Sequence, residues 1–106
     1  MTSQTVFDLQ ASFCQAMGHT ARLQILHVLR DSPQSVSQLT HTLGLAQPTI
    51  SRHLKILRNA GVVSLHRQGN ETLYQIANPK TLSVCDLLRE LLAEQAAHDV
   101  NLASIF

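Results

Sequence analysis

The sequence of 106 residues contains no tryptophan, few aromatic residues (4%) and no long uninterrupted apolar run. A membrane-spanning helix needs about 20 mostly apolar residues, so we expect no transmembrane segment and no membrane partner. The polar opening Met1-Thr2-Ser3-Gln4 lacks the basic and then apolar plan of a secretory signal, and the protein is therefore expected to be cytoplasmic. At about 100 to 200 residues per domain, residues 1–106 are predicted to form one domain.

Cysteine is almost absent from the chain. Cys14 and Cys85 lie far apart, and neither belongs to a CxxC pair. This spacing argues against a disulfide framework or a zinc knuckle, and both side chains are expected to be thiols in a reducing cytosol. The sequence also lacks a glycine-rich phosphate loop and a nucleophile elbow, and Asp86 and Glu90, one helical turn apart, are interpreted as a solvated helix face. We therefore do not expect an enzyme.

Acidic residues are missing from one long stretch, because no Asp or Glu occurs between Ser32 and Asn70. The cations of this stretch are Arg52, Lys55, Arg58 and Arg67. All acidic residues therefore flank it, although the formal net charge of the whole chain is only +1. A cationic segment without anions is typical of a surface that faces phosphates. The alternative is a solvated face that carries this charge by chance.

Apolar periodicity and capping residues divide the chain into elements. The predicted helices are about Thr5 to Met17, about Thr20 to Leu29, a short helix capped by Ser35 and ended by Gly44, and about Gln47 to Ala60. The extended runs Val62 to His66 and Glu71 to Ile76 are joined by Arg67 to Asn70, and a last helix follows from about Pro79 to at least Ala97. The predicted fold class is mainly α with a small β-hairpin: four helices, two strands and a fifth helix, which is a winged helix-turn-helix.

The helix that begins near Gln47 combines a predicted buried face with a polar, cationic face. The major groove of duplex DNA accepts one α-helix, so the polar face is expected to reach base edges and phosphates there. Base-edge contacts are expected from Gln47, Thr49, Ser51, Arg52 and His53, and phosphate contacts from Lys55 and Arg58. His53 is expected to orient this helix or touch DNA rather than bind a metal. The hairpin tip, with Arg67 and Gln68, is expected to reach the flanking backbone or minor groove.

The run QPTISRHLKILRNAGVV, from Gln47 to Val63, resembles the recognition-helix signature of the ArsR/SmtB repressors. The segment from His19 to Leu26 resembles the second helix of that family, and the segment from Arg67 to Ile76 resembles its wing. The resemblance implies a homodimeric bacterial repressor that binds an inverted-repeat operator in double-stranded DNA and is released when an inducer binds.

The usual sensory sites of that family are predicted to be absent. Its arsenic sensors carry Cys-Val-Cys where this chain reads Ser35-Val36-Ser37. The ligands of its zinc sensors, an Asp, two His and a Glu, align with Asn78, Lys80, Leu91 and Glu94. The two thiols of its sulfide sensors align with His27 and Ala93.

Cys14 and Cys85 nevertheless lie on the first and last predicted helices, which the family's fold brings together at the dimer interface. Two thiolates can share a thiophilic ion such as As(III), Cd(II) or Hg(II), or be oxidised to a disulfide or polysulfide link. The interpretation is an inducer site for a thiophilic metal or metalloid, such as arsenite, or for a reactive sulfur or oxygen species, with no cofactor required. The alternative remains open that both cysteines are purely structural apolar residues.

The last predicted helix carries an apolar arc too broad for a single packing contact. One side is expected to cover its own domain and the other a partner, so that a twofold homodimer presents two DNA-binding helices about one helical turn of DNA apart. A function of another class stays open as well, namely a winged-helix assembly module that binds protein rather than DNA.

Overall fold

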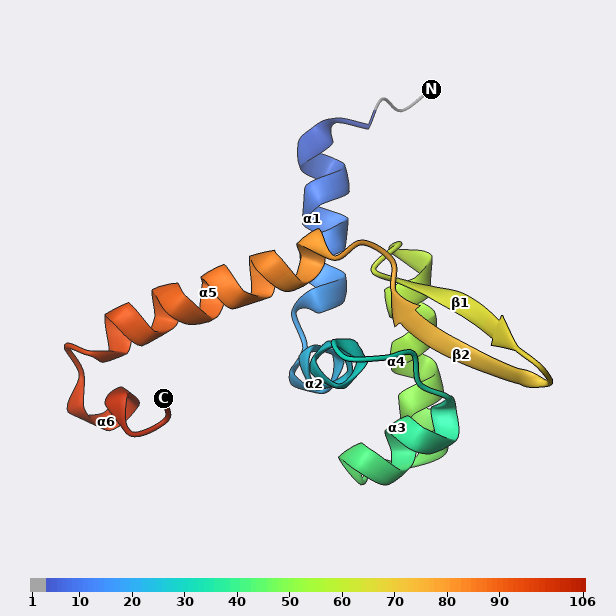
Figure 1. The fold of residues 1–106 in the computed structure, drawn as a ribbon. Coiled ribbons are helices and arrows are strands. Elements are labelled where there is room, and N and C mark those ends of the chain that lie inside the picture. Colours follow the sequence, from blue (N-terminus) through green and yellow to red (C-terminus); the bar gives the residue numbers. More distant parts are fainter. Residues whose placement is uncertain (1–3) are drawn as a thin grey trace.

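The computed structural model describes residues 4–106. Its elements are α1 (Val6–Met17), α2 (Thr20–Leu29), α3 (Val36–Leu43), α4 (Gln47–Asn59), β1 (Val63–Gln68), β2 (Glu71–Ile76), α5 (Lys80–Ala96) and α6 (Val100–Ala103). The winged helix-turn-helix predicted from the sequence is confirmed (Figure 1). Residues 1–3, on which the expectation about a secretory signal partly rests, lie outside the described residues.

Polar side chains fix the starts of α1 and α3. Thr5 and Asp8 form a capping box at α1, and Ser35 and Gln38 form another at α3, so the predicted Ser35 cap is confirmed. In both boxes the side chains accept hydrogen bonds from N–H groups that have no partner within the helix. Gly44 ends α3 with φ 68°, a conformation that a residue without Cβ adopts readily.

The hairpin is tighter than the sequence predicted. β1 and β2 pair antiparallel with Gln68 opposite Glu71, so Gln68 belongs to β1 and only a two-residue turn remains, beginning at Gly69 with φ 62°. At the base of the hairpin, Tyr74 exchanges two backbone hydrogen bonds with Gln34, of 2.7 and 3.0 Å. These bonds anchor the wing to the segment that precedes α3.

A buried core joins α2, α3, α4 and the hairpin, which together we call the central unit. Its largest fully buried side chains are Ile25, Leu26, Leu39, Ile50, Leu54, Leu57 and Val62. Each contributes about 1.5–3 kcal/mol when it leaves water. The central unit is therefore stabilised by a core of its own, and α1 adds to that core through Ala16 near its end.

The remaining helices, α1, α5 and α6, are called the peripheral helices. In Figure 1, α5 leaves the central unit as an arm, and α6 lies beside its far end. α5 buries only Thr81 and Ala96, whereas apolar side chains along it, such as Leu87 (64%) and Leu88 (51%), are exposed. The expectation that one side of this helix covers its own domain therefore holds only for the start of α5, where Thr81 is buried and Asp86 pairs with Arg30, while the far end contacts α6. The sequence did not predict α6, which Asp99 caps.

The single chain has an open shape. Its radius of gyration is 15.7 Å and its extents are 50 × 44 × 23 Å, whereas a compact domain of this length has a radius of gyration of about 13 Å. Both α1 and the α5 arm extend from the central unit (Figure 1), and both carry exposed apolar side chains. Within the part of the chain that the structure describes, no helix is long and apolar enough to span a bilayer.

Candidate nucleic-acid interface

The outer face of α4 gathers most of the side chains predicted to contact DNA. Those exposed are Gln47, Ser51, Arg52, Lys55 and Arg58, and Thr49 is partly exposed. The opposite face is fully buried through Ile50, Leu54 and Leu57, which fixes the helix in the central unit. Among residues 4–106, no carboxylate forms an ion pair with a cation of α4. The outer face therefore presents free positive charge and hydrogen-bond donors on a rigid support.

His53 lies on the inner side of α4 and is only 7% exposed. Its Nδ1 accepts a hydrogen bond from Nε of Arg22 at 3.2 Å, and its ring centroid lies 4.6 Å from that of His19. Burial, and then the basic neighbours His19, Arg22 and Arg52, lower the pKa of His53. Of the two roles predicted for His53, this position supports orienting the helix, because the side chain points away from the cationic face.

The wing is joined to α4 by a short, well-defined turn. The N–H of Val62 donates to the carbonyl oxygen of Leu57 at 2.9 Å, and Gly61 between them has φ 81°. The predicted wing residues Arg67 and Gln68 are exposed near the hairpin tip. Figure 1 shows the hairpin extending from the α4 side of the molecule, away from the α5 arm. The wing is thus placed to add polar contacts beside those of α4.

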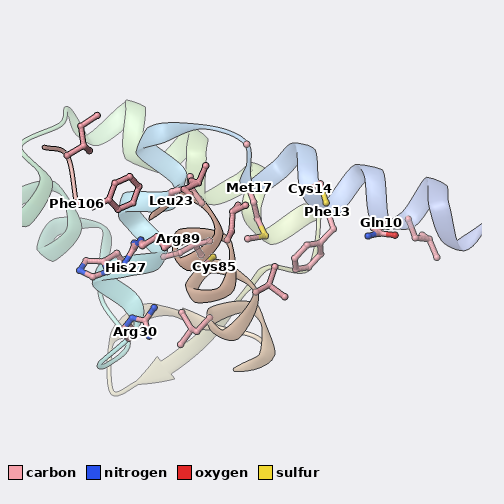
Figure 2. A pocket seen from close by; sticks show the side chains of 18 of the residues that line it. Gln10, Phe13, Cys14, Met17, Leu23, His27, Arg30, Cys85, Arg89 and Phe106 are labelled. Atoms are coloured by element: carbon pink, nitrogen blue, oxygen red, sulfur yellow. The ribbon is translucent and has the colours of Figure 1, made fainter. Parts of the chain in front are cut away.

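A second candidate site is a cavity of about 1020 Å³ lined by α1, α2, α5 and the chain end (Figure 2). Both cysteines line it as free thiols, with Cys14 exposed on α1 and Cys85 half-buried on α5. In Figure 2, Cys85 lies in the middle of the labelled side chains, Cys14 lies on α1, and His27 and Arg89 lie on the side away from α1. Burial raises the pKa of Cys85, so this thiol is protonated at neutral pH.

Two residues that align with metal ligands of the ArsR/SmtB sensors form local backbone hydrogen bonds instead. Oγ of Ser35 caps α3, and Oδ1 of Asn78 accepts a hydrogen bond from the N–H of Lys80 at 2.9 Å. In the described part of the chain, no three His, Cys, Asp or Glu side chains gather where they could hold a metal ion.

An ion pair that the sequence did not predict joins the end of α2 to α5. Arg30, at the end of α2, donates to both carboxylate oxygens of Asp86 on α5, at 2.6 and 3.2 Å. The side chain of Asp86, interpreted from the sequence as part of a solvated face, is 47% exposed, and it is also held by Arg30, which lowers the pKa of that carboxyl. Asp86 directly follows Cys85, so the pair links the cavity wall to the central unit.

Comparisons with known proteins agree with this architecture. The family model described as "Bacterial regulatory protein, arsR family" matches residues 19–64, which run from the start of α2 into β1. Rv0081, an uncharacterised HTH-type transcriptional regulator of Mycobacterium tuberculosis, is 36% identical over 94 residues, covering 88% of this chain and 82% of its own length. A probable mercury resistance operon repressor of Streptomyces lividans is 30% identical over 90 residues, covering 85% of this chain and 72% of its own length.

Solved structures extend the likeness to the peripheral helices. The crystal structure of Rv0081 matches with a TM-score of 0.81 and 34% identity, over 92% of this chain and 99% of that one. The solution structure of the homodimeric winged helix-turn-helix DNA-binding domain of Mb0332 from Mycobacterium bovis matches with a TM-score of 0.79 and 25% identity, over 93% of this chain and 97% of that one. Because these matches cover nearly the whole chain, they include the peripheral helices as well as the central unit.

Proposed function

The chain belongs to the arsR family of bacterial regulatory proteins, and on that premise we propose that this DNA-binding transcriptional regulator is a repressor. It binds an inverted-repeat operator as a homodimer and leaves the operator when an inducer binds. Family membership makes the chain a transcriptional regulator rather than an enzyme.

The observation that carries this proposal is the free cationic face of α4. Arg52, Lys55 and Arg58 are exposed there without a carboxylate partner among the described residues, on a helix whose other face is fully buried. Such a face fits the major groove, where polar side chains reach base edges and cations hold phosphates. The assigned contacts are Gln47, Thr49, Ser51 and Arg52 to bases, Lys55 and Arg58 to phosphates, and Arg67 and Gln68 to the flanking backbone.

The exposed apolar side chains of the peripheral helices support a homodimer. Val84, Leu87 and Leu91 are 48–64% exposed on α5, and Phe7 is 75% exposed on α1. Burying such surface against a second copy is favourable by about 25 cal/mol per Å². The homodimeric relative from M. bovis, which matches over these helices, supports the same arrangement. A twofold pair then presents two α4 helices to half-sites about 34 Å apart.

Selection from a mixed-sequence duplex library tests DNA recognition. We expect the retained sequences to contain an inverted repeat, and the affinity to fall steeply as salt rises, since each phosphate contact adds about 0.9 to the slope of log affinity against log salt. Arg52→Ala should weaken binding, whereas Lys80→Ala, which removes the same charge from the exposed start of α5, should not. Enrichment of a single half-site would contradict the homodimer, and the absence of duplex binding at any salt would favour the assembly module.

We assign the inducer response to Cys14 and Cys85, because both line the cavity where α1, α2 and α5 meet. Two thiols that bind one thiophilic ion each lose a proton, whereas oxidation by a peroxide joins the sulfur atoms while the peroxide takes up two electrons and two protons. The name of the S. lividans relative, a probable mercury resistance operon repressor, supports a soft metal. Because burial raises the pKa of Cys85, protons compete with the metal and the response should weaken in acid.

Release from the selected duplex by Hg(II), arsenite or hydrogen peroxide tests this assignment. We expect release from the wild-type protein and little release from Cys14→Ser or Cys85→Ser. Equal release from all three proteins would exclude the cysteines and leave them as structural apolar residues. Release that is lost in only one variant would contradict a site that needs both thiols.

A further inference from the structure

The side chain of Arg22 connects three helices, α1, α2 and α4, which contact one another in pairs. From α2, its Nη1 donates to the backbone carbonyl oxygens of Gln15 and Ala16 at 3.4 and 3.3 Å, near the end of α1. Its Nε donates to Nδ1 of His53 on α4 at 3.2 Å. One guanidinium group thus holds a peripheral helix and the DNA-contacting helix in a fixed relation.

This contact needs a neutral His53, because Nδ1 accepts a hydrogen bond only when it carries no proton. Nδ1 of the neighbouring His19 also accepts a bond, from the N–H of Ala21 at 3.1 Å. The charged or titratable groups that act on His53 are His19 and Arg22 from α2 and Arg52 from α4 itself, while α1 contributes only the carbonyl oxygens bound to Arg22. All of these groups are basic, so none favours a proton on His53.

We propose that Arg22 and neutral His53 form an acid-sensitive clasp that holds α4 in the orientation required for DNA binding. Protonation of Nδ1 turns the acceptor into a second donor that faces the guanidinium group, so the bond between Arg22 and His53 breaks and two cations repel. The inference rests on the proposed role of α4 in the major groove. Arg22 and His53 are positioning residues, since His53 is buried behind the face that contacts DNA.

The direction of the pH effect follows from the burial and the basic neighbours of His53. A lowered pKa in the folded protein means that above the ordinary histidine pKa of about 6.5 the ring is neutral in all states and the clasp is at full strength. Below that pH, the His53 ring takes up a proton in the unfolded or unclasped chain. In the clasped state the ring stays neutral until the pH approaches its lowered pKa. Acid therefore favours the unclasped state.

The sharpest test compares the wild-type protein with His53→Asn. The Oδ1 atom of asparagine branches from Cγ as Nδ1 does in histidine, so it can accept the bond from Arg22 but does not titrate. We compare the two proteins by the ratio of the wild-type affinity for the selected duplex to the affinity of His53→Asn. This ratio should fall roughly three- to tenfold from about pH 7.5 to about pH 5.5, since one pKa unit is worth a factor of ten. His41→Asn, at an exposed position on α3, serves as the matched control and should keep the wild-type fall.

A second measurement needs no variant. If DNA binding requires the neutral ring, then bound duplex must lower the pKa of His53, by reciprocity of the two equilibria. NMR titration of the His53 ring with and without duplex measures the direction of this change.

Identical pH profiles for the wild-type protein and His53→Asn, or a rise in the pKa of His53 on duplex binding, would overturn the clasp while leaving DNA binding intact. Failure of the wild-type protein to bind any duplex at any pH would instead overturn the proposed function itself.

Discussion

The central unit and the peripheral helices use the same kinds of apolar residue in opposite ways. In the central unit, Leu39, Leu54 and Leu57 are fully buried against one another's helices. On α5, Leu87 and Leu88 are more than half exposed. Because a solvent-exposed leucine contributes little to the stability of its own chain, the buried leucines of the central unit stabilise the fold, whereas those of α5 add stability only when another surface covers them. The division matches the proposed function, in which the central unit recognises DNA and the peripheral helices form the dimer.

Leu54→Ala tests the central unit and should have the largest effect on the free energy of unfolding. The side chain is 0% exposed, so the change removes buried methyl groups and leaves a cavity, at a cost of about 2–5 kcal/mol in the free energy of unfolding. Leu91→Ala removes the same atoms from a side chain that is 48% exposed on α5, and should cost less than half as much at low protein concentration. Denaturant unfolding of both variants is the measurement, and equal costs at every concentration would abolish the distinction.

Leu87→Asp tests whether the peripheral helices form the dimer. It places a charge within the apolar surface that the dimer is proposed to cover, and a carboxylate cannot be buried there without a partner. We expect a monomer by sedimentation, an unchanged far-ultraviolet spectrum, and affinity for the selected duplex on the order of a hundredfold lower, since each half-site is then bound separately. Leu87→Met, which keeps an apolar side chain of similar volume, is the control. A dimeric Leu87→Asp protein would place the interface elsewhere.

The two capping boxes compare the central unit with α1 through smaller changes in stability. Ser35→Ala removes the cap of α3, whose start is buried in the central unit, and should lower the free energy of unfolding by about 1 kcal/mol. Thr5→Ala removes the equivalent cap of α1, where both Thr5 and Asp8 are exposed, and that helix start can fray without unfolding the central unit. Thermal unfolding should therefore shift for Ser35→Ala more than for Thr5→Ala. Equal shifts would mean that α1 and the central unit unfold together.

Much of the fold could be predicted because its signals are local. Ser35, Gly44 and Gly61 mark helix ends through their own side chains or their freedom at positive φ, and the apolar period of α4 identifies its buried face. The position of α5 could not be predicted in the same way. Its apolar arc is compatible with its own domain, a partner or both, and only the three-dimensional arrangement shows that one chain leaves it uncovered.

The residues of the candidate sites also differ in whether a local sequence pattern predicts their position. The exposed cations of α4 follow from helical spacing alone, whereas the inward position of His53 depends on how α4 meets Arg22 of α2. The pair of Arg30 and Asp86 lies between residues distant in the sequence, so no local pattern indicates it. Sequence spacing predicts which residues share a helix face, but the partner of a charged side chain is decided by packing.

The ion pair between Arg30 and Asp86 links α5 to the central unit, and removing it should have the smallest effect on stability. Both side chains remain partly exposed, so solvent and salt screen their attraction. Arg30 lowers the pKa of Asp86, so the pair stabilises the fold above the ordinary carboxyl pKa of 3.8 and is lost as the pH falls through the lower value in the folded protein. Asp86→Asn should therefore melt slightly below the wild-type protein at neutral pH, and at the same temperature below the lowered pKa. Melting curves across the acid range measure this convergence, and a difference that persists in acid would mean that Asp86 stabilises the chain through something other than its charge.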